Sequence, residues 1–514
     1  MTEEPRPRSE SPEADETRPY ATPGAFPSVG GATPPPPPRR GSPVPRVLAG
    51  IAVLVVLVAG LFILLPRGGA DPAASGPMSP SPGPSQADAS APSGSVSPPV
   101  TATVGPAPSG DLPSGDLPSG DLPIDPAVEA RIREIIEQVP AIRGLEPRQE
   151  VPFRFITAER FEEELRDLFA ADNPPEEVNA EEDLLKRLGL LEPEADLEEL
   201  VLDLYGSQVA AFYDTRTGSF TVVQRGEGAE FGSSDAIVVA HEYVHALQDQ
   251  HFDLEGTQVT DPAEGDRALG VLGLIEGDAV AVMVDWAVAN LTFEEILGLQ
   301  EALTPADQEL LESMPPVLRR QLEFPYTDGW AFVMAIRADG GYAAVDAAFG
   351  DRPVSSEQIM HPEKYLDRED PVLVELPDLT TTLGAGWRER YEQTLGEMLI
   401  GVLVADGQSA PAPSVPGVLP ALPNAEAAAG WAGDRLVSLD GPDGTWAVVW
   451  QTAWDSAPDA DGFSAATEAA MDDLRFPHEV EASAVVSGLD APVLVLVASD
   501  EATLEDVRAA LPES

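Results

Sequence analysis

The sequence predicts an α+β protein with two folded parts: a mainly helical domain with a small sheet at residues 125–405, and a small α+β domain at 427–514. Three observations support this prediction. In the first part, long stretches with apolar residues at helical spacing alternate with a few short β-rich runs. A Pro- and Ala-rich stretch at 406–426 then reads as a linker. The second part runs strand, strand, helix, strand, strand, helix.

The segments that precede the first domain are predicted to be disordered, apart from one apolar run. Residues 1–46 are rich in Pro, Ser and Glu, and residues 66–124 are rich in Pro, Ser, Gly and Ala and end in three SGDLP repeats. Such segments have too little apolar surface to form a core. We interpret the first as a cytoplasmic tail and the second as an extended spacer.

The apolar run at 47–65, VLAGIAVLVVLVAGLFILL, contains 19 residues without a charge and could cross a bilayer as a helix. Arg39, Arg40 and Arg46 precede it, whereas only Arg67 follows it closely. This asymmetry predicts a cytoplasmic N-terminus and an extracellular catalytic domain, in a single-pass protein of the cell membrane. The alternative is a cleaved signal peptide, which fits less well because of the long segment before the run.

The elements of the first domain follow from hydrophobic spacing. We expect, in order, a helix at 126–139, a strand at 151–157, helices at 158–170, 179–190 and 196–205, a hairpin at 210–223, a helix from Ser234 to 252 with Ser234 or Asp235 as its N-cap, a long buried helix at 266–289, and further helices to about 404. In the second domain, RLVSLD, WAVVWQTAW, EASAVVSGL and VLVLVAS are the expected strands, with helices at 460–474 and 501–511 on one face of an antiparallel sheet. This domain contains no cluster of catalytic residue types, and its lone histidine, His478, is expected to be structural or exposed.

The composition excludes several kinds of site. The chain has no cysteine, which excludes disulfides, Cys-ligated zinc and a thiol nucleophile. Lys and Arg total 30 against 88 Asp and Glu, a formal net charge of -58. Because a nucleic acid needs a basic surface to displace its counterions, we expect no nucleic-acid partner. The chain has only five histidines, so their positions are informative.

Residues 241–245, His-Glu-Tyr-Val-His, form an HExxH motif. Residues four apart share one face of a helix, so His241 and His245 can bind one cation. Glu242 then lies beside this cation and can take a proton from a water molecule whose pKa the ion lowers. We therefore expect a Zn²⁺ site. The alternative is a core helix with incidental histidines.

A catalytic zinc site needs a third protein ligand. His251 is a poor candidate because it lies about 240° around the helix from the second motif histidine, and we expect it to be structural. The next long helix is apolar except for Glu276, Asp278 and Asp285. Burying a carboxylate in such a run is costly unless a cation receives it, so we take Glu276 as the third ligand. Asp278 either orients an imidazole or is satisfied locally.

HEYVHALQDQ (241–250) followed by IEGDA (275–279) resembles the gluzincin branch of zinc metallopeptidases, which has a thermolysin-like architecture. The resemblance covers residues 200–290. It departs from the family pattern at Val280, where these enzymes have an aspartate. HALQDQHFDL with a later HPEKY (361–365) also resembles a group of bacterial membrane-anchored proteins.

The resemblance implies a zincin-like domain in which a mixed sheet precedes the HExxH helix. It implies His241, His245 and Glu276 as metal ligands and Glu242 as the general base. Gluzincins also commonly use a Tyr or His from the second half of the domain to stabilise the oxyanion.

Two residues are the main candidates for that donor. His361 precedes a proline, which favours an extended or turn conformation that could aim the ring into a cleft. Its alternative is a hydrogen-bonded loop histidine. Tyr326 is the second candidate, and Tyr365 is a further alternative. The strand at 219–223 is either an edge to which a peptide substrate adds or an ordinary sheet strand.

These features together predict a membrane-anchored zinc metallopeptidase that acts on a peptide or protein substrate. The alternative is a non-catalytic metal-binding, scaffold or partner-binding ectodomain. The coordination shell separates the two, because three protein ligands and a water favour an enzyme whereas four protein ligands favour a structural site.

Overall fold

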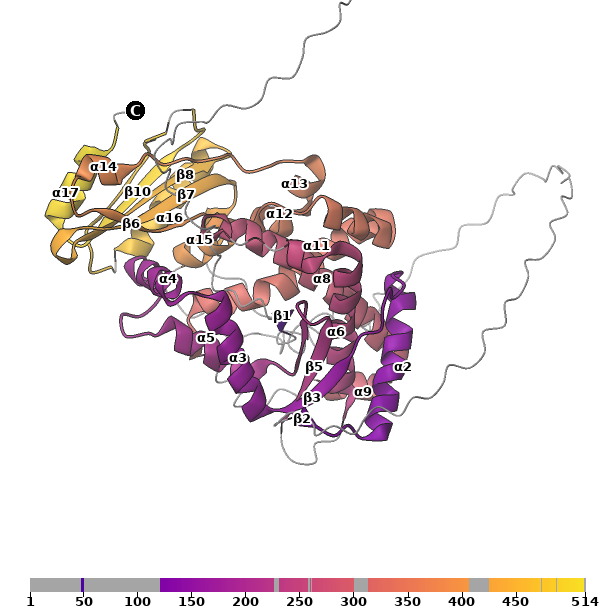
Figure 1. The fold of residues 1–514 in the computed structure, drawn as a ribbon. Coiled ribbons are helices and arrows are strands. Elements are labelled where there is room, and N and C mark those ends of the chain that lie inside the picture. The colour runs from indigo at the N-terminus through magenta and orange to yellow at the C-terminus, as the bar shows by residue number, and fades with distance from the viewer. Residues whose placement is uncertain are drawn as a thin grey trace, which may run out of the picture. The chain divides into compact units, whose positions relative to one another are not determined.

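The computed structural model describes residues 48–49, 121–225, 231–257, 259, 261–299, 313–405, 425–472, 474–486 and 488–512. These residues form an α+β fold with two five-stranded sheets (Figure 1). The α+β class predicted from the sequence is therefore correct. The expected tail, and nearly all of the expected spacer and linker, lie outside the described residues.

The first sheet is mixed and has the strand order β1-β4-β5-β3-β2. Its strands are β1 (Leu48–Ala49), β2 (Asp121–Leu122), β3 (Phe153–Thr157), β4 (Ala211–Asp214) and β5 (Ser219–Gln224). The strands β3 and β5 are parallel, and every other pair is antiparallel. Because β5 is paired on both sides, the idea that 219–223 is a free edge is wrong. It is an ordinary sheet strand.

Only two residues of the expected membrane-spanning run are described. Leu48 and Ala49 form β1, which pairs with β4, whereas a helix is expected there. The rest of 47–65 lies outside the described residues. Within the described part of the chain, no helix is both long and apolar enough to span a membrane.

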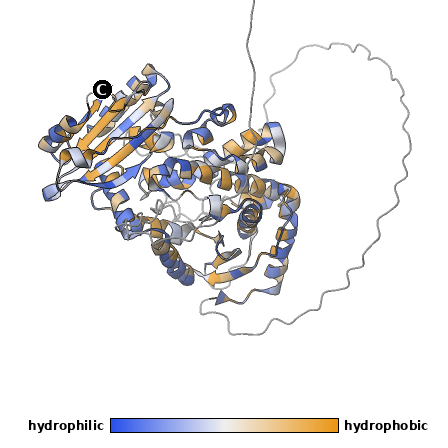
Figure 2. Cartoon of the chain, turned by 45° about the horizontal axis from the view of Figure 1, so that its top comes forward, coloured by the Kyte–Doolittle hydropathy of each residue, from blue (hydrophilic) through white to orange (hydrophobic). Residues whose placement is uncertain are grey.

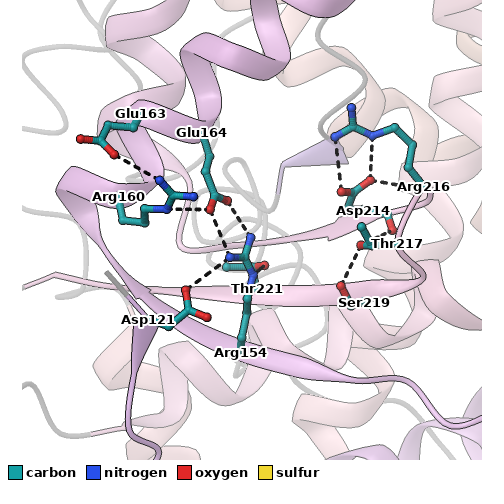
Figure 3. Close-up of polar contacts among 10 residues, drawn as sticks. All are labelled: Asp121, Arg154, Arg160, Glu163, Glu164, Asp214, Arg216, Thr217, Ser219 and Thr221. Atoms are coloured by element: carbon teal, nitrogen blue, oxygen red, sulfur yellow. Dashed lines mark hydrogen bonds and ion pairs between the residues drawn. The ribbon is translucent and has the colours of Figure 1, made fainter. Parts of the chain in front are cut away.

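Ion pairs connect the first sheet to the helix that follows β3. Arg154 on β3 donates to Glu164 on α3 (Ala158–Asp172) at 2.6 Å and to Thr221 on β5 at 3.1 Å (Figure 3). Asp121 on β2 is 3.5 Å from the same guanidinium. Arg160, on the same helix as Glu164, also contacts this carboxylate at 2.9 Å. One arginine thus joins three strands and a helix.

The remaining helices of this part include those that surround the HExxH motif. They are α2 (Pro126–Arg143), α4 (Pro175–Arg187), α5 (Leu197–Gln208), α6 (Ser233–Phe252), α7 (Leu254–Thr257), α8 (Gly265–Asn290), α9 (Phe293–Gly298), α11 (Pro316–Gly350), α12 (Ser356–Met360) and α13 (Pro362–Asp367). The motif helix α6 packs against α8, α2 and β4. Most of α8 is buried, as its apolar sequence predicts.

Glycines allow α8 and α11 to cross at very short distance. A Cβ atom on Gly277 would lie 2.1 Å from the carbonyl oxygen of Gly329, and one on Gly329 would lie 2.2 Å from that of Gly273. No real side chain tolerates such contacts, so the two backbones touch only because these positions lack a Cβ. The crossing sets the distance between the residues that flank it, Glu276 on α8 and Tyr326 on α11.

The second sheet is antiparallel, with the order β6-β7-β8-β10-β9. Its strands are β6 (Arg388–Gln393), β7 (Trp431–Asp440), β8 (Trp446–Trp454), β9 (His478–Glu481) and β10 (Val493–Ala498). Two expectations are wrong here. The strand before β10 is 478–481 and not EASAVVSGL, and the sheet takes β6 from residues that precede the expected linker.

Helices cover both faces of the second sheet, in place of the single face expected from the sequence. Alternate residues of β10 enter two separate cores, so Val495 packs with Phe463 of α16 (Ala457–Met471), whereas Leu496 packs with Val507 of α17 (Glu501–Ala510). Both faces of the strand are therefore apolar, which Figure 2 shows as orange ribbons. The helix α15 (Gly396–Val404) belongs to the same core as α16, and the helix α14 (Leu379–Leu383) belongs to the same core as α17.

Candidate metal centre

The first two candidate ligands lie one turn apart on α6. His241 and His245 are fully buried, and their rings meet edge to face with centroids 4.6 Å apart. Their Nε2 atoms are 3.0 Å apart. The helix begins at Ser233, and the Asp235 carboxylate accepts the N–H of Gly232 at 2.7 Å, so Asp235 stabilises the first turn without being the N-cap. The apolar neighbours of both histidines place this face of α6 in the core.

Glu276 on α8 completes the group of candidate ligands. Its Oε2 lies 3.1 Å from His241 Nε2 and 3.4 Å from His245 Nε2. Nitrogen and oxygen ligands of tetrahedral zinc, at about 2.0–2.1 Å from the ion, are roughly 3.3 Å from one another. The three side-chain atoms therefore have the separation that a tetrahedral ion needs, and the structure brings the three predicted ligands together.

The electrostatics of the group favour an ionised glutamate. Burial by itself raises the pKa of Glu276, but the adjacent His245 and His241 outweigh it and lower that pKa to about 2. Burial lowers the pKa of His241. Burial also opposes protonation of His245, but the Glu276 carboxylate outweighs it and raises the His245 pKa to about 9. A carboxylate with two imidazoles is a suitable donor set for a divalent cation.

Glu242 lies next to this group and is fully buried. The backbone of Tyr213 contributes a hydrogen bond to its carboxylate, and no side chain among the described residues is hydrogen-bonded to it. Burial raises the pKa of Glu242 to about 8. A buried carboxyl without a side-chain partner costs stability, which makes Glu242 a candidate for a functional role.

Two tyrosines lie near the Glu276 carboxylate. The ring of Tyr326 on α11 lies 6.1 Å from that of His241, and its hydroxyl interacts with Glu276. Burial and the charge of Glu276 raise the pKa of Tyr326 well above its ordinary value, which keeps the phenol protonated. The same two causes raise the pKa of Tyr205 on α5. The structure thus places the predicted Tyr326 at the site and adds Tyr205, which no sequence motif indicates.

Gln248 and Asp278 lie behind His245. The Gln248 Oε1 is 2.9 Å from His245 Nδ1, and the Gln248 Nε2 donates to the Asp278 carboxylate and to the Ile275 carbonyl, each at 2.9 Å. Arg143, the last residue of α2, has its Nε 2.8 Å from Asp278. Of the two roles open to Asp278, the structure favours the orientation of an imidazole, although Asp278 acts through Gln248.

His361 is not part of the group. It lies between α12 and α13, where its Nε2 is 2.9 Å from Glu397 and its Nδ1 is 3.9 Å from Glu363. Tyr365 donates its hydroxyl to the Asp351 carbonyl at 2.9 Å and packs in the core. Neither residue makes a described contact with the three candidate ligands, so the structure does not support either as the oxyanion donor.

The end of α6 is fixed by polar contacts. The Asp249 carboxylate accepts the hydroxyl of Tyr213 on β4 at 2.8 Å. Gln250 accepts the N–H of Arg148 at 2.6 Å, and His251 Nε2 is 2.8 Å from the Glu146 carbonyl. His251 therefore has the structural position that its helical angle predicts. The lone His478 lies on β9, with Nδ1 3.3 Å from the Phe476 carbonyl.

Comparison with known proteins gives one match. Residues 382–508 match a family described as a domain of unknown function (DUF8575). The matched segment begins within α14 and contains all five strands of the second sheet, and it does not include the candidate metal ligands. Neither the curated proteins nor the solved structures give a match.

Proposed function

We propose that this chain is a zinc-dependent hydrolase of the metallopeptidase type. One observation carries the proposal: Glu242, a buried carboxyl with no side-chain partner among the described residues, lies beside three side chains whose ligand atoms are 3.0–3.4 Å apart. A structural metal site does not need such a group, whereas hydrolysis needs a base at this position. The gluzincin-like fold remains part of the proposal.

The residues that would hold the ion are His241, His245 and Glu276, which leave one corner of a tetrahedron for water or substrate. When bound, a zinc ion supplies a Lewis acid that lowers the pKa of water and polarises a carbonyl group. A nearby cation also favours the ionised form of Glu242, which opposes the effect of burial on its pKa.

Glu242 moves the proton in the proposed reaction. Its carboxylate accepts a proton from the attacking water as the water oxygen bonds to the carbonyl carbon. It returns that proton to the amide nitrogen as the C–N bond breaks, so the carboxylate is regenerated. Tyr326 donates a hydrogen bond to the carbonyl oxygen as negative charge develops there. Its raised pKa keeps the donor proton on the phenol.

The test compares two buried glutamates in the full-length chain purified in mild detergent. Glu242→Gln should keep one zinc ion per chain and lose about 10²–10⁴-fold in turnover of peptides cleaved by the wild type. Glu181→Gln, which alters a buried glutamate on α4, should keep both the zinc ion and the turnover of the wild type. Peptides are found by incubating a mixed peptide library with the wild type and reading the products by mass spectrometry. Equal turnover by Glu242→Gln would overturn the mechanism.

The burial of the site favours a second candidate function. The candidate ligands and Glu242 are each at most 1% exposed. A closed metal site that only holds α6 to α8 would have this property. Zinc bound with a fourth protein ligand, together with no cleavage of any library peptide, would identify this second function.

We also propose that residues 47–65 anchor the chain in the cell membrane, with the C-terminal bulk outside. The proposal rests on the length and apolar character of the run. A span needs roughly 17–25 residues, so residues 50–65 alone are too few, and the proposed anchor requires Leu48 and Ala49 to leave β1. Resistance to alkaline extraction, with the C-terminus digestible by external protease in intact cells, is the expected result. Release by alkali would refute the anchor.

A further inference from the structure

We infer that Gln248, Asp278 and Arg143 are positioning residues that fix the His245 imidazole for metal binding. This inference rests on the proposed metal site. It extends that site to three side chains outside the ligand set, which come from α6, α8 and α2. All three are fully buried.

The surroundings of Gln248 determine which way its amide points. One end of the amide lies 2.9 Å from an Asp278 carboxylate oxygen and 2.9 Å from the Ile275 carbonyl oxygen. A backbone carbonyl oxygen can only accept a hydrogen bond, so the contact with Ile275 requires this end to be the NH₂ group. The amide oxygen therefore faces His245 Nδ1 at 2.9 Å.

This orientation determines where His245 carries its proton. An amide oxygen can only accept, so the Nδ1 atom of His245 must donate and must hold the hydrogen. The lone pair of the neutral ring is then on Nε2, the atom that lies 3.4 Å from Glu276 Oε2 and 3.0 Å from His241 Nε2. The side chain of Gln248 thus selects the tautomer that can bind an ion and fixes the plane of the ring.

Arg143 holds the far end of this chain of contacts. Its Nε lies 2.8 and 2.9 Å from the two oxygens of Asp278, and its Nη2 lies 2.7 Å from Asp346. The guanidinium also stacks over the ring of Tyr342 at 4.7 Å. The guanidinium can only donate, so it fixes the position of the Asp278 carboxyl group beside the Gln248 amide.

The two imidazoles differ in this support. Among the described residues, the buried Nδ1 of His241 has no hydrogen-bond partner, whereas that of His245 has Gln248. Gln248, on the same helix, therefore controls the orientation of His245 and not that of His241. Loss of Gln248 should weaken metal binding directly, and not only through the fold.

The experiment measures zinc affinity of the full-length chain by competition with a chromophoric chelator. Gln248→Met keeps the side-chain length and removes the amide, and it should weaken zinc binding about 10–100-fold. The matched control is Gln451→Met, because Gln451 is also fully buried and its amide bonds to the Val493 carbonyl at 2.9 Å and to the Val485 N–H at 2.8 Å in the second sheet. The control should lose stability to urea but keep zinc affinity within about threefold.

A pair of changes tests the direction of the hydrogen bonds. Gln248→Glu alone places two carboxylates side by side and should weaken zinc binding at least as much as Gln248→Met. Adding Asp278→Asn restores one donor and one acceptor between positions 248 and 278, and it should recover part of the lost affinity. The recovery is incomplete because Arg143 then loses its carboxylate partner and the Ile275 carbonyl loses its donor. The absorption spectrum of the cobalt-substituted protein should shift in Gln248→Met and return in the double variant.

The outcomes separate this inference from the proposed function. If the wild type binds no zinc, the metal site and the inference both fail. If the wild type binds zinc and Gln248→Met binds it equally well, or if Asp278→Asn does not rescue Gln248→Glu, the inference alone is overturned. If Gln248→Met does not fold, Asp278→Asn alone decides, since it weakens the hold on the Gln248 amide and should lower zinc affinity.

Discussion

Replacing Gly277 by alanine should separate α8 from α11 and disturb the candidate site. The added Cβ would lie 2.1 Å from the Gly329 carbonyl oxygen, 2.3 Å from its carbon and 2.8 Å from the Trp330 nitrogen. These atoms are backbone and cannot rotate away. Reaching the 3.4 Å at which ordinary contact begins requires the helices to move apart by about 1.3 Å.

The expected cost follows from the packing. Overpacking a buried contact costs about 1–3 kcal/mol and sometimes more, and backbone atoms on both sides place this substitution at the upper end. The movement also draws Tyr326 away from Glu276, because these residues flank the crossing. We therefore expect Gly277→Ala to unfold at lower urea concentration and, in the folded protein, to lose the proposed peptidase turnover.

Gly462→Ala is the matched control. Gly462 lies within α16, and a Cβ there would meet nothing within 4 Å. Alanine should stabilise that helix by about 0.5–1 kcal/mol. Urea unfolding of the two variants beside the wild type measures both effects. If Gly277→Ala is as stable as Gly462→Ala, the helices do not touch at Gly277 and the reasoning is refuted.

Three further predictions concern the site and the fold. Tyr326→Phe should lower kcat about 10²–10³-fold with little change in KM, since it removes one oxyanion donor; steady-state kinetics showing an unchanged kcat would exclude that role. Glu181→Gln should make unfolding less dependent on pH. Burial raises the pKa of Glu181 from 4.5 to about 8, so the wild type loses up to about 1.4 kcal/mol per pH unit as pH rises through that window. The advantage of the variant, measured by urea unfolding, should vanish below pH 4.5, and a constant advantage would contradict this. Removing zinc with a chelator should lower the unfolding temperature of the wild type, and the same treatment of His245→Ala should not.

The sequence predicts the helices of this protein better than its sheets. A helix buries residues that repeat within one segment, so spacing alone reveals α6 and α8. Edge strands give weaker signals because one side needs charge to discourage further pairing. The strand β6 reads RERYEQ and β9 reads HEVE, and neither resembles an apolar strand. The described residues of 482–489 form no strand although they are mostly apolar or small, because apolar character does not by itself determine pairing.

The candidate ligands follow from spacing, but their surroundings do not. His241 and His245 are one turn apart, and Glu276 is a rare carboxylate in an apolar helix. Gln248 lies seven residues after His241, on the same face of the helix, and this spacing could have indicated its role. Arg143 and Tyr205 reach the site from distant elements, so only the tertiary structure shows them.

The strand order of the second sheet limits where recombination can divide the gene without breaking a folded unit. Its edge strand β6 and the rest of its strands lie on opposite sides of residues 406–424. Even before β6, the N–H of Val372 donates to the Ala432 carbonyl at 2.7 Å. A recombination breakpoint within 406–424 would therefore leave β6 and β7 in different products, each with an unpaired strand. A recombination breakpoint must lie upstream of Val372 if the second sheet is to be transferred intact to another gene.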